Sequence, residues 1–141
     1  MDVEINILGV LLATVMSFVV GFVWYMPKVF GEEWRTLIKM DKKTMEKGPG
    51  TSAWVKTTAG ALLQAYVLAH VTFLSFSFFN GTSYFKSSLM SALWLWLGFQ
   101  LSVFLTHDSF EQRPIKLTVL NAGNQLVTLV AMGLAIGWLG L

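Results

Sequence analysis

The residue types best suited to acid–base chemistry lie close together in residues 106–114, THDSFEQRP. His107 and Asp108 are adjacent, and Glu111 follows three residues after Asp108. A histidine beside a carboxylate at a membrane surface can exchange protons near neutral pH. However, no zinc-ligand spacing or glycine-rich phosphate loop accompanies them. We therefore predict that the protein is not an enzyme and has no catalytic residue, cofactor or metal site. Glu111 and Arg113 are instead expected to pair or to cap the ends of neighbouring helices.

Amide side chains form a second polar group, and each lies inside an otherwise apolar stretch: Gln64, Gln100, Asn121, Asn124 and Gln125. Polar side chains are costly in hydrocarbon, so they mark helix contacts or pathways. At a helical rise of about 1.5 Å per residue, all five fall in one layer, roughly 6–12 Å from the same membrane surface. Two interpretations stay open. The amides bond one another across helices, at about 1 kcal/mol or less each, or they line a polar vestibule for a small solute or ion.

His70 is the one ionisable side chain expected near the centre of the bilayer. A proton relay or a metal site would need an acidic residue or a second histidine at the same depth. The sequence offers no such partner, and two copies of His70 could meet only at the axis of an oligomer. We therefore predict a neutral histidine bonded to a carbonyl group.

Membrane-spanning helices must position these side chains, because the chain is too apolar for a soluble domain of its size. Its 141 residues are 55% hydrophobic and 13% charged, about half the charged fraction of ordinary soluble domains. Apolar stretches long enough to cross a bilayer occupy about residues 5–25, 57–79, 87–105 and 117–139. The first is too long, and its flank too acidic, for a cleavable signal peptide. We predict one all-α domain over residues 1–141, an integral membrane protein with four transmembrane helices.

The distribution of Lys and Arg predicts the orientation of these helices. The first loop holds seven of the ten, the third loop holds Arg113 and Lys116, and the opposite side holds only Lys86. Positively charged loops stay in the cytoplasm. We therefore expect the first and third loops to be cytoplasmic and both termini to be outside. The clustered lysines are expected to contact anionic lipid headgroups, and not nucleic acid.

Small residues at four-residue spacing predict close helix contacts. One such stripe consists of Gly9, Ala13, Ser17 and Gly21, a second of Ala61, Ala65 and Ala69, and a third of Gly133 and Gly137. The sequence leaves open whether these stripes meet within one chain or between subunits. Four helices enclose little interior, so we favour a homo-oligomer.

The stretch GFVWYMPKVFGEEW, residues 21–34, is predicted to be an elbow where the chain leaves the membrane. Trp24 and Tyr25 suit the membrane–water interface, and Pro27 ends the span. Phe30 and Trp34 begin an apolar face that continues at helical spacing. We predict a short amphipathic helix on the membrane surface over about residues 28–46; the alternative is a disordered basic loop.

Two segments together resemble a family of small bacterial membrane proteins known as domain of unknown function 1761. The first pattern is met by Gly21, Trp24, Tyr25, Pro27, Phe30, Gly31 and Trp34. The second is met by Phe110, Glu111, Arg113 and Pro114, followed by Asn121 and Gly123. Gln112 stands where we would expect glycine and Asn124 where we would expect an aromatic residue. The resemblance implies a four-span protein of a bacterial inner (plasma) membrane and no particular activity.

The sequence is compatible with three functions. The first is a homo-oligomer that offers a polar path or binding site to a small solute or ion. The second is a structural or accessory membrane subunit without transport activity of its own. A membrane enzyme acting through His107, Asp108 and Glu111 is the least favoured.

Overall fold

The computed structural model describes residues 3–79 and 81–141, and these residues form helices and connecting turns without strands. Seven α-helices follow one another: α1 (Ile7–Trp24), α2 (Glu32–Leu37), α3 (Lys42–Lys47), α4 (Thr51–Phe78), α5 (Tyr84–Leu95), α6 (Ser102–Phe110) and α7 (Ile115–Leu139). Two π-helical turns, η1 (Pro27–Gly31) and η2 (Trp96–Leu101), lie between them. Because η2 joins α5 to α6, Tyr84–Phe110 is one continuous helix. The four long helices are apolar enough to cross a membrane, which confirms the predicted fold class.

The helices are longer than the apolar stretches at two places. α4 begins six residues before the predicted span, so Lys56 belongs to this helix and not to the first loop. The third long helix continues to Phe110, so His107 and Asp108 lie in its last turns and not in a loop. Gln112 then takes a left-handed conformation, with φ of 53°, and ends the helix. Hydropathy identifies only the apolar part of a helix. The hydrogen-bonded helix can continue into polar residues beyond that part, so its ends were not predicted.

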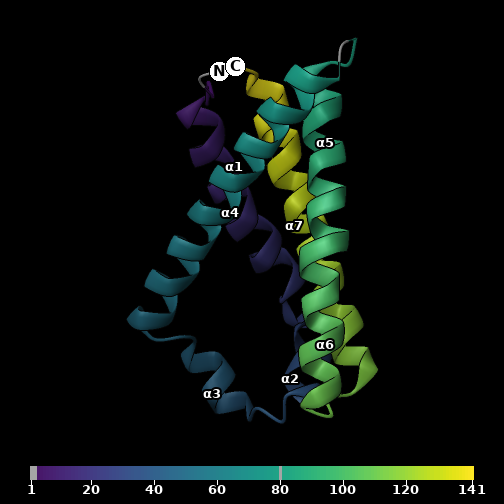
Figure 1. Ribbon diagram of the computed structural model, residues 1–141. Coiled ribbons are helices and arrows are strands. Elements are labelled where there is room, and N and C mark those ends of the chain that lie inside the picture. Colours follow the sequence, from purple (N-terminus) through teal and green to yellow (C-terminus); the bar gives the residue numbers. More distant parts are fainter. Residues whose placement is uncertain (1–2, 80) are drawn as a thin grey trace.

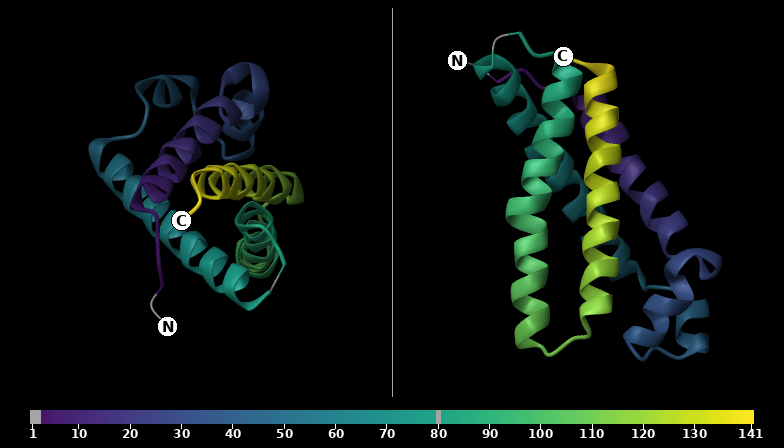
Figure 2. Two further views of the ribbon diagram at one scale, coloured as in Figure 1. Left: turned by 90° about the horizontal axis from the view of Figure 1, so that it is seen from above. Right: turned by 90° about the vertical axis from the view of Figure 1, so that its right-hand side faces the viewer.

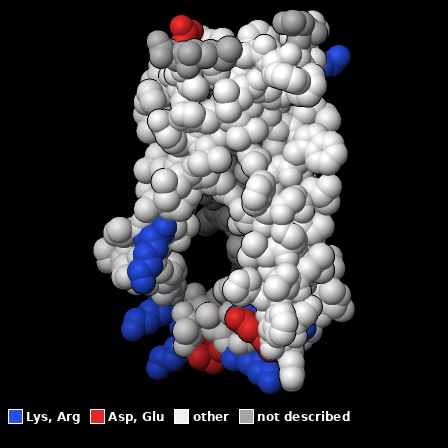
Figure 3. Space-filling model, in the orientation of Figure 1, with Lys and Arg blue, Asp and Glu red and all other residues white. Residues whose placement is uncertain are grey.

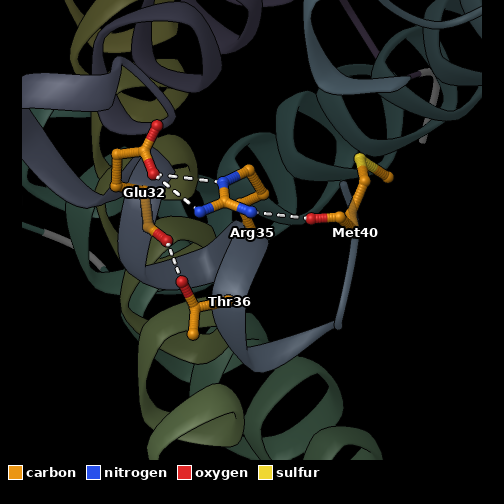
Figure 4. Close-up of polar contacts among 4 residues, drawn as sticks. All are labelled: Glu32, Arg35, Thr36 and Met40. Atoms are coloured by element: carbon orange, nitrogen blue, oxygen red, sulfur yellow. Dashed lines mark hydrogen bonds and ion pairs between the residues drawn. The ribbon is translucent and has the colours of Figure 1, made fainter. Parts of the chain in front are cut away.

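The surface segment is helical but is not the single helix predicted over residues 28–46. It is divided into η1, α2 and α3, with a turn in which Lys39 adopts φ of 57° (Figure 1). Arg35 fastens this turn: its guanidinium donates to the Met40 carbonyl at 2.8 Å and pairs with Glu32 (Figure 4). Asp41 then caps α3 by accepting hydrogen bonds from Thr44, which lowers the pKa of the Asp41 carboxyl.

α7 lies between the other long helices and is the most buried of them (Figure 2). Its central residues Leu129 and Met132 are almost completely buried, together with Leu68 of α4. Gly133 and Gly137 allow α5 to approach, since a Cβ on Gly137 would lie 3.0 Å from the Cα of Phe85. On the α1 side, a Cβ on Gly9 would lie 3.7 Å from the Cα of Ile136. These small residues therefore pack within the chain.

The long helices diverge from one end of the molecule to the other. α1 begins and α7 ends at the same end of the molecule (Figure 1). There the Asn6 side chain donates to the Leu139 carbonyl at 3.4 Å. At the end that carries α2 and α3, the start of α4 stands apart from α5, α6 and α7 (Figure 1). Residues 51–60 are all exposed as a result. Figure 3 shows the consequence, an opening between α4 and the helices opposite it.

Candidate functional site

The predicted amide layer is divided between two separate contacts. Gln64 of α4 donates to Gln125 of α7 at 3.3 Å. Asn121, one turn earlier on α7, accepts from the hydroxyl of Tyr25 at 3.3 Å, beside the end of α1. Both contacts join helices far apart in the sequence, which supports the interpretation of these three amides as helix contacts.

The other two amides differ from these three. Asn124 is 5% exposed, and its Nδ2 has no hydrogen-bond partner among residues 3–79 and 81–141. Gln100, in η2, makes no side-chain hydrogen bond in the same part of the chain and faces a cavity together with Gln64. Gln100 therefore has a free amide to offer to a ligand, whereas Asn124 is enclosed.

This cavity has a volume of about 570 Å³, within the range typical of ligand-binding pockets. It lies between α4, the α5–η2 helix and α7, where α4 diverges from its neighbours (Figure 3). Apart from the two glutamines, its walls are apolar: Gly60, Leu63, Val67, Val71, Leu95, Phe99 and Leu129. The geometry suits a mainly apolar molecule that carries a hydrogen-bonding group.

Sequence reasoning identified the two glutamines of this site but not its walls. Leu63, Val67 and Phe99 are indistinguishable in the sequence from residues that face lipid. Trp96 was also missed; its indole donates to the Ala122 carbonyl at 2.8 Å and fixes η2 against α7. A tryptophan inside an apolar stretch was the available signal, since a buried indole needs an acceptor.

His70 lies apart from the cavity and has a local role. Its Nδ1 is 3.1 Å from the Tyr66 carbonyl, one turn earlier in α4. Its ring also makes an edge contact with the Tyr66 ring, at a centroid distance of 4.4 Å. This matches the histidine–carbonyl contact predicted from the sequence. No group of three or more potential metal ligands comes together in the described residues.

The His107–Asp108 pair is not brought together as a site. Asp108 is 5% exposed and accepts from the Thr118 hydroxyl of α7 at 2.6 Å. Arg113 donates its backbone N–H to the Asp108 carbonyl at 2.9 Å, and its guanidinium pairs with Glu111. His107 is exposed. The arrangement is a clamp that joins α6 to α7, with Pro114 immediately before the first residue of α7.

The elbow is built from two aromatic pairs and one close backbone approach. The rings of Trp24 and Phe30 have centroids 4.5 Å apart, and those of Tyr25 and Trp34 have centroids 5.1 Å apart. Gly31 donates its N–H to the Met26 carbonyl at 3.0 Å, which closes the π-helical turn. A Cβ at Gly31 would clash with the Tyr25 carbonyl oxygen and lie 2.9 Å from the Met26 carbonyl group, so only glycine fits here.

The elbow also contacts the start of α7, although the two segments lie far apart in the sequence. A Cβ on Gly123 would lie 3.4 Å from the Trp24 ring, so the ring rests on α7. Lys116 pairs with Glu33 at the beginning of α2. With the Tyr25–Asn121 bond, these contacts unite the two segments whose motifs were singled out in the sequence.

Comparison with known protein families gives a match over most of the chain. A family model described as "Protein of unknown function (DUF1761)" matches residues 8–137. No curated protein and no solved structure matches the chain.

Proposed function

The chain belongs to the DUF1761 family of proteins of unknown function, and from this premise we propose that it is a membrane protein that binds a largely apolar molecule in the cavity beside α4. One observation carries the proposal. The 570 Å³ cavity has apolar walls, and the Gln100 amide at its edge has no partner in the described part of the chain. An apolar ligand with a hydroxyl or carbonyl group would fill the walls and bond this amide.

The cavity favours binding over conduction of an ion or a polar solute. Such a path needs polar groups along its length to replace lost hydration. Here Gln64 is bonded to Gln125, Asn121 is bonded to Tyr25, and the remaining walls are apolar. An accessory subunit that binds no ligand is the competing possibility, and the same experiment separates the two.

Cavity filling tests the proposal, with an uncharged diazirine-bearing hexadecanol as the photoactivated probe. Gly60 lines the cavity, and a Cβ there would meet nothing within 4 Å, so tryptophan at this position should fill the cavity without disturbing the fold. In phosphatidylcholine nanodiscs, Gly60→Trp is expected to lower probe adducts on residues 60–71 by about tenfold, a difference of about 1.4 kcal/mol in binding. Adducts are mapped by peptide mass spectrometry.

Ala59→Trp is the matched control, because residue 59 is exposed on the same turn of α4 but is not part of the cavity wall. We expect this variant to be labelled like the wild type. Equal labelling of both tryptophan variants would contradict a ligand site in the cavity and favour the accessory subunit.

We also propose that the end bearing α2 and α3 faces the cytoplasm of a bacterial cell, across the inner membrane. Support comes from charge, because nine of the ten Lys and Arg belong to this end and only Lys86 to the other.

The predicted homo-oligomer remains a proposal as well. The start of α4 is one surface that could receive a second copy, because residues 51–60 are all exposed.

Cysteine labelling tests the orientation, because the chain contains no cysteine of its own. In intact spheroplasts, Lys86→Cys is expected to react with a membrane-impermeant maleimide, and Lys47→Cys only after the cells are opened. The rates should differ more than tenfold before lysis. Labelling of Lys47→Cys but not of Lys86→Cys in intact spheroplasts would contradict the proposed orientation.

A further inference from the structure

The charged residues at the α2–α3 end divide into a paired and an unpaired group. On the side of α2 and α7, Arg35 pairs with Glu32, Lys116 with Glu33, and Arg113 with Glu111. In the described residues, no ion pair is formed by the other basic side chains of this end: Lys28, Lys39, Lys42, Lys43, Lys47 and Lys56. Two carboxylates, Asp41 and Glu46, offset part of this charge. The side of α3 and α4 therefore has an excess of positive charge.

Lys56 connects this positive side to the cavity. On a helix, residues three or four positions apart share one face. Lys56 is followed at these spacings by Gly60, then Leu63 and Gln64, then Val67 and finally Val71, and all except Lys56 line the cavity. The cavity wall is thus one continuous face of α4 with an exposed lysine at its beginning.

The length of this face matches one leaflet of a bilayer. Fifteen residues separate Lys56 from Val71, which corresponds to about 22 Å along a helix. A bilayer with its headgroup regions is about 40–45 Å thick, so a single leaflet measures about 20–22 Å. A lipid lying along α4 would therefore place its headgroup near Lys56 and the end of its chain near Val71.

We propose that the occupant of the cavity is an anionic phospholipid of this leaflet, an inference that rests on the proposed function. Lys56 contacts the phosphate, one acyl chain lies against Leu63, Val67 and Val71, and the Gln100 amide donates to an ester carbonyl. An anionic lipid fits better than a zwitterionic one, because the unpaired lysines on this side outnumber the carboxylates Asp41 and Glu46, so the surface attracts a phosphate more strongly than a lipid ammonium group.

Two photoactivatable lipids that differ only in the headgroup test this proposal. Phosphatidylglycerol and phosphatidylcholine, each with a diazirine on one acyl chain, are incorporated as trace probes into nanodiscs that hold the full chain. A lysine near an anionic headgroup is worth about fivefold in affinity. We expect phosphatidylglycerol to label residues 60–71 about five times more than phosphatidylcholine. Lys56→Gln should abolish this preference.

Lys43→Gln is the matched control, since it removes the same charge from α3 without altering the cavity face of α4. This variant should keep most of the headgroup preference. Equal labelling of wild type by both lipids, or a preference that survives in Lys56→Gln, would overturn the proposal. If either of these results is found but Gly60→Trp still prevents labelling of residues 60–71 by both lipids, the apolar site stands and only the anionic assignment fails. If Gly60→Trp blocks neither, the proposed function fails as well.

Discussion

Replacing Gly31 with alanine is expected to destabilise the protein by about 3 kcal/mol, the upper end of the usual cost of overpacking, because the added group meets rigid backbone. The added Cβ would clash with the Tyr25 carbonyl oxygen and lie 2.9 Å from the backbone of Met26. Neither can move without opening the π-helical turn that directs α2 towards α7. We expect the Tyr25–Trp34 and Trp24–Phe30 ring contacts to be lost with it. Thermal unfolding in detergent, followed by near-ultraviolet circular dichroism, measures both effects.

Gly21→Ala is the control for this prediction, because it makes the same chemical change ten residues earlier. A Cβ on Gly21 would meet nothing within 4 Å, and the residue lies inside α1. Its stability should stay within about 1 kcal/mol of the wild type, in line with the small helix preference of alanine over glycine. Similar stability of the two variants would show that the elbow relaxes around a side chain at position 31.

Removing the carboxylate of Asp108 is the second change with a large expected effect. Asp108→Ala should cost about 2–3 kcal/mol, the range for a buried hydrogen bond to a charged group. The Thr118 side chain is only 3% exposed, so its hydroxyl would be buried without its hydrogen-bond acceptor. Arg113 would also lose the carboxylate that lies 3.9 Å from its Nε. The clamp between α6 and α7 would loosen, which is measurable as a lower midpoint of thermal unfolding and faster hydrogen exchange at the start of α7.

A double-mutant cycle with Thr118→Val isolates the Asp108–Thr118 bond from other effects of the substitution. We expect a coupling energy of about 1–2 kcal/mol, so the double variant should be more stable than the two single losses predict. Glu111→Ala is the control for general charge effects, because this exposed ion pair should contribute less than about 1 kcal/mol. Additive losses from Asp108 and Thr118 would contradict the clamp.

The sequence was sufficient for the parts of the fold that depend on composition and spacing. Four apolar stretches predicted the four helices that are long and apolar enough to cross a membrane. The small residues on α1 and α7 correctly indicated close helix contacts. Their partners could not be predicted, because a stripe of small residues carries no signal that distinguishes a helix of the same chain from one of a second copy.

The candidate site was less predictable, for a physical reason. Gln64 and Gln125 were identifiable in the sequence because polar side chains are rare in hydrocarbon, and the structure shows them hydrogen-bonded to each other. The cavity beside them depends on the angle at which α4 diverges from α5 and α7, which no single residue determines. Its apolar walls look like lipid-facing residues, so only the three-dimensional arrangement reveals them. Likewise, His107 and Asp108 look like an acid–base pair until their different burial is known.

The packing of α1 against α7 also constrains the order of events during synthesis. Gly9 faces Ile136, so the first helix to enter the membrane finds its main partner in the last. At ribosomal rates of about 5–20 residues per second, α1 waits on the order of ten seconds before α7 is complete. During that interval its small-residue face is covered only by lipid or by another protein. We therefore expect the nascent chain to be vulnerable to proteolysis, and to depend on insertion factors, until its final helix has been made.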